Sequence, residues 1–159
     1  MSTTTATTRG RDLIAPELFN RLTDDVTRDP HCPDRDTAER IVDQAVVFLV
    51  ACALSDDPIG PSPLVDLGWH AFILRTADYR RFCNTVLGEF VDHVPNDTAP
   101  TIEQRTASAA RTLDALHATG LQVDTGVWAQ EMPCSSCSDT KTGGDGDGCH
   151  KGCHDSQAK

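Results

Sequence analysis

The stretch of residues 36–54 constrains the fold most, because it predicts one helix with two apolar faces. Its start is predicted at Asp36, because Glu39 follows three residues later in a near match to a capping box. The apolar positions are Ile41, Ala45, Phe48, Leu49 and Cys52 on one face and Val42, Val46 and Val50 on the other. A helix that is apolar on two faces must be covered on both, so we expect it at the centre of a bundle.

Apolar residues recur at helical spacing in other stretches as well. We expect these further helices over residues 12–27, 63–75, 77–87 and 101–120. The last one is indicated by Ile102, Thr106, Ala109, Leu113 and Leu116, which are spaced as on one helix face. No alternating run is long enough to indicate a strand. The sequence therefore predicts an all-α fold, a small helical bundle of about five helices.

Local signals predict where these helices begin and end. Thr101 with Gln104 forms a capping box, and Ser62 is placed to cap the helix that starts at Pro63. Gly88 is expected to end the helix over residues 77–87 in the left-handed conformation, and an extended segment follows it.

Three further features complete the scaffold. Pro16 falls in the first turn of the first helix, where proline is tolerated. Thr76 can cap the helix that follows it, so we expect a break there. Residues 121–128, which include Val127 and Trp128, are expected to lie back across the bundle.

The two ends of the chain differ from the helical domain, which we assign to residues 11–129. Residues 1–10 are rich in threonine and are expected to be disordered. Residues 130–159 form an irregular tail rich in cysteine, histidine and glycine, with too few apolar side chains to build a core.

Composition and hydropathy exclude several classes of function. The start has no apolar segment of the kind found in a secretory signal, and the apolar run over residues 45–54 is too short to span a bilayer. The net charge of −10 disfavours nucleic-acid and membrane partners. We therefore expect a cytoplasmic protein, where seven cysteines favour metal binding or redox chemistry over disulfides.

The tail carries the first candidate metal site. Its two cysteine pairs are Cys134 with Cys137 and Cys149 with Cys153, with His150 and His154 as alternative ligands. Two close pairs joined by a glycine-rich loop are typical of a structural zinc site, because each pair can supply one edge of a tetrahedron. The alternatives are a reduced, unstructured tail and a disulfide or redox switch.

The second candidate site lies inside the predicted bundle. Asp66 and His70 are four residues apart and share one helix face, while His93 follows on the extended segment. With Cys83, they could act as metal ligands, or a histidine could act as a base oriented by the carboxylate. The alternative is that each histidine is a hydrogen-bonded structural residue.

The pattern VDLGWHAFILRTADYRRFC, followed by GEFVDHVP, resembles a motif of small bacterial proteins labelled glycine-rich domain-containing-protein-like. The similarity covers about residues 64–95, and the tail sequence GCHKGCHDS resembles the cysteine-rich end of those proteins. The resemblance implies that the motif positions are Asp66, Trp69, His70, Tyr79, Cys83 and His93. It implies no particular reaction.

Three functions are compatible with these patterns. The leading hypothesis is a small cytoplasmic protein that binds a transition metal, most simply zinc, through the tail cysteines and has a binding or regulatory role with a protein or peptide partner. The second is an enzyme with its site at Asp66, His70 and His93. The third is a partner or precursor-like protein whose tail is modified or delivers metal to another chain.

Overall fold

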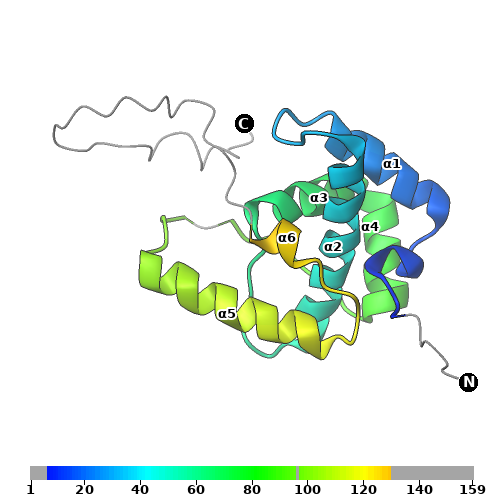
Figure 1. Cartoon of the computed structure of the whole chain (residues 1–159). Helices are drawn as coiled ribbons and strands as arrows, with labels where there is room; N and C mark the ends of the chain where they lie inside the picture. The colour runs from blue at the N-terminus through cyan, green and yellow to red at the C-terminus, as the bar shows by residue number, and fades with distance from the viewer. Residues whose placement is uncertain (1–6, 96, 130–159) are drawn as a thin grey trace, which may run out of the picture.

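The computed structural model describes residues 7–95 and 97–129, and within those residues it contains helices and no strands (Figure 1). The elements are the 3₁₀ turn η1 (Gly10–Leu13), α1 (Pro16–Thr27), α2 (Arg35–Leu54), α3 (Pro63–Leu74), α4 (Thr76–Phe82), the π-helical turn η2 (Cys83–Leu87), α5 (Ile102–Ala118) and α6 (Thr125–Trp128). The predicted all-α class is confirmed.

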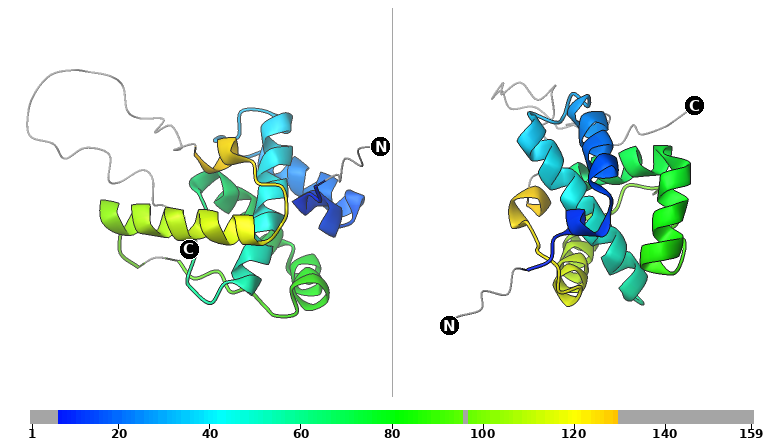
Figure 2. Two further views of the ribbon diagram at one scale, coloured as in Figure 1. Left: turned by 60° about the horizontal axis from the view of Figure 1, so that its bottom comes forward. Right: turned by 90° about the vertical axis from the view of Figure 1, so that its right-hand side faces the viewer.

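Helix α2 is the centre of the bundle, as its two apolar faces predict. Figure 2 shows it surrounded by α1, α3, α5 and α6. Ile41, Val46 and Phe48 are fully buried. Helix α3 packs closely on α2 at Gly68, where an added Cβ would lie 2.9 Å from the Cβ of Ala45. A larger residue at position 68 would push the two helices apart.

Two predicted helix starts were wrong. The first helix begins at Pro16 rather than near residue 12, because Ala15 precedes a proline and is held extended. Residues 10–13 instead form the separate turn η1. Helix α2 begins one residue before the predicted Asp36, because the side chain of Asp34 accepts a hydrogen bond from the Thr37 amide and caps it.

The N-terminal turn lies closer to the core than its composition suggests. The sequence predicts disorder over residues 1–10, but Gly10 is buried in η1. An added Cβ at Gly10 would lie 2.2 Å from the carbonyl oxygen of Asp43, so only glycine allows this approach to α2. The Arg11 amide also donates to Asp43 Oδ1 (2.9 Å).

The predicted caps around α3, η2 and α5 are confirmed. The Ser62 hydroxyl accepts from the Val65 amide, and Thr101 and Gln104 satisfy each other's amides. Gly88 adopts φ +79° and ends η2. The break between α3 and α4 falls at Arg75 rather than at Thr76, which is the first residue of α4.

Helix α5 packs on the body mainly near its C-terminal end (Figure 1). Leu116 and Thr112 are buried there, whereas Ile102 is 74% exposed. The apolar spacing therefore predicted the helix but not a buried face along its whole length.

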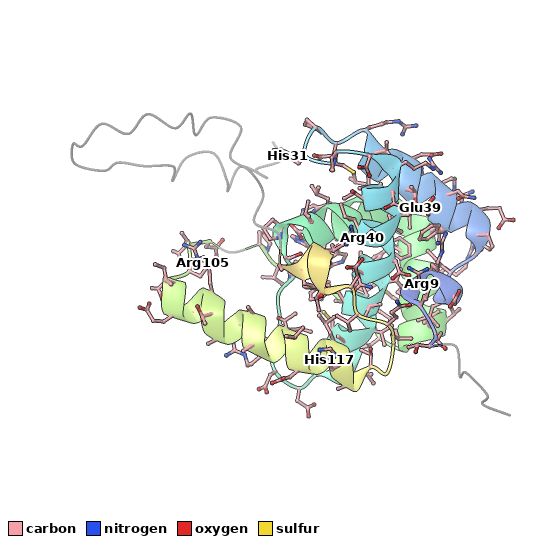
Figure 3. The ribbon with its side chains drawn as sticks, viewed as in Figure 1. Arg9, His31, Glu39, Arg40, Arg105 and His117 are labelled. Carbon is pink, nitrogen blue, oxygen red and sulfur yellow. The ribbon has the colours of Figure 1, made fainter. Side chains whose placement is uncertain are left out.

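The segment after α5 returns across α2 to the short helix α6, as the sequence predicts for residues 121–128. Trp128 packs near Phe48 with ring centroids 6.0 Å apart, and Val127 is buried. The guanidinium of Arg40 donates to both carboxylate oxygens of Asp124 (2.6 and 2.9 Å), next to α6 (Figure 3). No helix in the described part of the chain combines the length and apolarity of a membrane span.

Candidate metal centre

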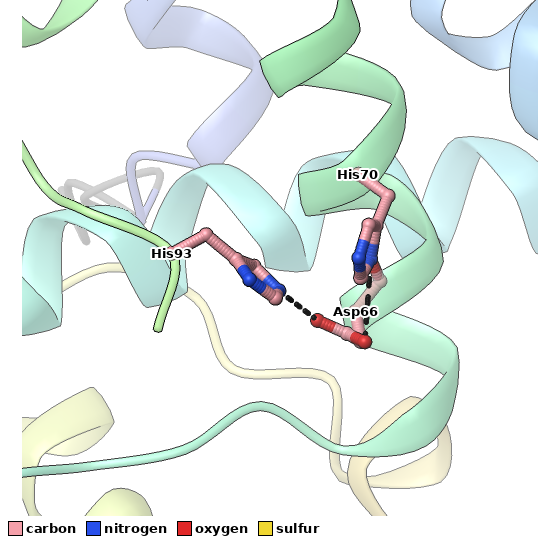
Figure 4. Close-up of side chains that lie close together, drawn as sticks. All are labelled: Asp66, His70 and His93. Atoms are coloured by element: carbon pink, nitrogen blue, oxygen red, sulfur yellow. Dashed lines mark hydrogen bonds and ion pairs between the residues drawn. The ribbon is translucent and has the colours of Figure 1, made fainter. Parts of the chain in front are cut away.

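Three side chains from two parts of the chain meet beside α3 (Figure 4). Asp66 lies in the first turn of α3, and His70 follows one turn later on the same face. His93 reaches them from the extended segment that follows η2. One potential ligand atom from each residue lies within 4.8 Å of the other two, so the three form a candidate metal-binding triad.

The carboxylate of Asp66 joins the two imidazoles. His93 Nε2 lies 3.2 Å from Asp66 Oδ1, and His70 Nδ1 lies 3.3 Å from Oδ2. His70 Nδ1 also lies 2.8 Å from the main-chain oxygen of Asp66. A carbonyl oxygen only accepts, so Nδ1–H of His70 donates to it, and in the neutral ring Nε2 keeps its lone pair.

The Asp66 carboxylate also changes the acid–base behaviour of His70. It raises the pKa of His70, mainly through the hydrogen bond between the two side chains, while partial burial opposes the shift. Proton and metal would compete for the same imidazole, since a ligating histidine must be neutral.

The three side chains of the centre are partly exposed to solvent. The exposed fractions of the side chains are 32% for Asp66, 39% for His70 and 24% for His93. An ion can therefore reach the three groups without the helices separating.

Aromatic neighbours fix the position of His93. Its ring centroid lies 4.4 Å from the Trp69 ring and 4.5 Å from the His70 ring. The Tyr79 hydroxyl donates to the main-chain oxygen of Val91 (2.6 Å), two residues before His93, and accepts from Trp69 Nε1 (3.0 Å). Burial raises the pKa of Tyr79, so its hydroxyl stays protonated and available to donate.

The donor set fits a first-row transition metal. Two imidazoles and one carboxylate bind zinc in catalytic sites and iron(II) in facial triads, and both arrangements leave coordination positions open. Two ligand atoms of a tetrahedral zinc ion at bond lengths of about 2.0–2.1 Å lie about 3.3 Å apart. The separation of 3.2 Å between His93 Nε2 and Asp66 Oδ1 is close to that distance.

The other predicted site residues fall in two groups. Cys83 is fully buried in η2 and is not part of the triad, while Trp69 and Tyr79 pack in the core beside it. The tail candidates lie outside the described residues: Cys134, Cys137, Cys149 and Cys153, with His150 and His154. The sequence reasoning did not find the bond from Tyr79 to Val91. The available signal was that the chain's one tyrosine lies just before the segment that carries His93.

Fold and site together define an all-helical domain with a candidate two-histidine, one-carboxylate metal centre. A family model described as UCP032817-like matches residues 13–119, and the chain belongs to that family. The match includes all three residues of the triad and ends before the cysteine-rich tail. The chain matches no curated protein and no solved structure.

The family match corrects the resemblance drawn from the sequence. The assignment to the glycine-rich domain-containing-protein-like family was wrong, because the model that matches is the UCP032817-like one. That assignment rested on a motif over residues 64–95 and on tail residues, whereas the family match covers the scaffold from α1 to α5.

Proposed function

We propose that this protein binds one divalent transition-metal ion at Asp66, His70 and His93, most simply zinc, and acts in the cytoplasm in a binding or regulatory role. The observation that carries this proposal is that three ligand atoms, from residues up to 27 positions apart, lie within 4.8 Å of one another. The donor types support a borderline-soft metal such as zinc over magnesium or calcium, which prefer all-oxygen sites.

The test measures zinc affinity of the full-length chain by competition with a chromophoric chelator. Replacing the four tail cysteines Cys134, Cys137, Cys149 and Cys153 with serine removes the thiolates of the other candidate site. We expect this variant to bind one zinc ion and to lose at least about 100-fold in affinity when His93→Ala is added, more than the loss of a second-shell partner costs.

His31→Ala is the matched control, because His31 is also hydrogen-bonded to an aspartate, Asp29, but lies on the exposed loop between α1 and α2 (Figure 3). It should leave zinc affinity unchanged. If the four-serine variant binds no zinc, or binds it equally well without His93, the proposal is wrong.

Catalysis is the second candidate, favoured by the partial exposure of the triad. A bound zinc ion would supply Lewis acidity, which polarises a substrate carbonyl or phosphoryl group. Asp66 would bind the ion and orient His70. His93 would supply the third ligand from the extended segment that follows η2. Zinc-loaded protein should then hydrolyse an activated ester such as p-nitrophenyl acetate, and His93→Ala should not. Equal rates for both proteins would exclude this role.

The tail remains a separate proposal based on its sequence. Its four cysteines, with His150 and His154 as alternates, would bind a second zinc ion, or would be modified, or would deliver metal to a partner protein or peptide. Wild-type protein should then bind two zinc ions and the four-serine variant one. A wild-type stoichiometry of one, unchanged by the four substitutions, would contradict a tail site.

A further inference from the structure

Residues 89–95, which carry His93, have few connections to the rest of the fold. Within the described residues, two hydrogen bonds hold this segment: His93 to Asp66, and the Val91 carbonyl to the Tyr79 hydroxyl. Phe90 and Val94 are 52% and 79% exposed, so burial contributes little at those positions. Ring contacts of Phe90 with Tyr79 and of His93 with Trp69, together with the partial burial of Val91, complete the attachment of the segment. The Tyr79 hydroxyl is therefore one of a small number of restraints on the position of His93.

The hydroxyl of Tyr79 is itself held in place. Tyr79 is 2% exposed, and its oxygen accepts the indole N–H of Trp69 while donating to Val91. Trp69 immediately precedes His70 on α3, and its ring packs against the His93 ring. One pair of side chains thus connects helix α3, helix α4 and the segment of His93.

The ring of Tyr79 has a separate packing role. It makes edge-to-face contacts with Phe72 (5.3 Å between centroids, 77°) and with Phe90 (5.4 Å, 83°). A phenylalanine would keep both contacts, so packing requires the ring alone. Without the oxygen, the Val91 carbonyl and the Trp69 indole N–H would each lose a partner.

We propose that Tyr79 is a positioning residue of the metal centre, which acts by holding the main chain at Val91 so that His93 meets Asp66 and His70. The proposal rests on the proposed function, because it concerns the same triad. Tyr79 does not touch the ion site itself; it acts through His93. Loss of such an outer partner typically lowers metal affinity about 10–100-fold.

The experiment compares Tyr79→Phe with Thr112→Val in the full-length four-serine variant. Thr112 is a matched control, because it is also 2% exposed and its hydroxyl both accepts from and donates to a main chain, that of Gly60, away from the triad. We expect Tyr79→Phe to weaken zinc binding about 10–100-fold and Thr112→Val to leave zinc binding unchanged. The two substitutions should lower the free energy of unfolding by similar amounts. The visible spectrum of the cobalt(II)-loaded protein should change in Tyr79→Phe alone, since it reports ligand geometry.

A third variant tests whether the effect passes through His93. In a His93→Ala background, Tyr79→Phe should no longer change the residual affinity. Equal zinc affinity and an equal cobalt spectrum in Tyr79→Phe and its parent would overturn the positioning role and leave the metal site standing. A parent that binds no metal would overturn both proposals.

Discussion

Two connecting segments return across the bundle, and they are held in opposite ways. Residues 121–124, between α5 and α6, are held by hydrogen bonds to fixed groups of α2 and of the N-terminal stretch. These bonds run from Gln44 to the main chain of Gln122 and Asp124, from Arg40 to the Asp124 carboxylate, and from the Gln122 amide to the Thr8 carbonyl. Residues 89–95 have only the bonds of Val91 and His93 within the described chain.

Residues 121–124 are held by groups with a structural role, whereas residues 89–95 are held partly by the candidate metal centre. The first segment is tied through Gln44, which is fully buried and uses all four of its hydrogen-bonding positions, with Asp43, Gln122, Asp124 and Trp128. The second segment is tied partly through a side chain of the candidate site. Metal binding would replace the bond between His93 and Asp66, so that segment can adapt to an ion, whereas the first has no comparable freedom.

The largest expected effect comes from breaking the first segment at Gln44. In Gln44→Leu, the buried Asp43 carboxylate loses a donor, and three partly buried groups lose their partner as well: the Trp128 indole N–H, the Asp124 amide and the Gln122 carbonyl. We expect the free energy of unfolding to fall by about 3 kcal/mol, since each unsatisfied buried group costs about 1–3 kcal/mol. Urea denaturation followed by circular dichroism measures the change.

Gln122→Leu is the matched control, because it makes the same chemical change on an exposed residue. Among the described residues, Gln122 forms hydrogen bonds through its main chain and not through its side chain. It should change stability by less than about 0.5 kcal/mol. If Gln44→Leu costs no more than this control, the amide network does not hold the segment.

A smaller effect is expected from Asp124→Asn. The guanidinium of Arg40 holds the pKa of the Asp124 carboxyl below its ordinary value, through a hydrogen bond that outweighs partial burial. The pair is about one-third exposed, so its loss should cost about 1 kcal/mol at neutral pH. A depressed pKa contributes stability that is complete above the unfolded-state value and is lost as the pH falls through the folded-state value.

The stability difference between wild type and Asp124→Asn should therefore be constant from about pH 7 to about pH 5 and should shrink below about pH 4. Asp114→Asn, an exposed carboxylate on α5, serves as control and should show little difference at any pH. A gap between wild type and Asp124→Asn that widens in acid would contradict the assigned direction.

The sequence predicted the features that depend on residues close together in the chain. The caps of α3 and α5 and the shared face of Asp66 and His70 depend on residues three or four apart, so local spacing predicted them. The start of α2 was misplaced because Asp34 lies two residues before Asp36, and only the structure shows which of them accepts a bond from the helix.

Longer-range features needed the fold. His93 was a candidate because of its residue type. Its contact with Asp66 depends on the left-handed conformation of Gly88 and on the bond from Tyr79 to Val91, which no local pattern predicts. The role of Gln44 was missed for a similar reason, because its partners Asp124 and Trp128 lie about 80 residues along the chain. The tail assignment to zinc remains a prediction from spacing.

The smallest effect on metal-free stability should come from the second segment. His93→Ala removes one partly exposed hydrogen bond and the ring contacts with Trp69 and His70, so the free energy of unfolding should fall by about 1 kcal/mol in a metal-chelating buffer. Adding zinc at about 100 times its dissociation constant should raise the stability of wild type by about 2.7 kcal/mol and leave that of His93→Ala nearly unchanged. If His93→Ala lowered the metal-free stability as much as Gln44→Leu does, residues 89–95 would have the same structural role as residues 121–124. The contrast between the two segments would then be wrong.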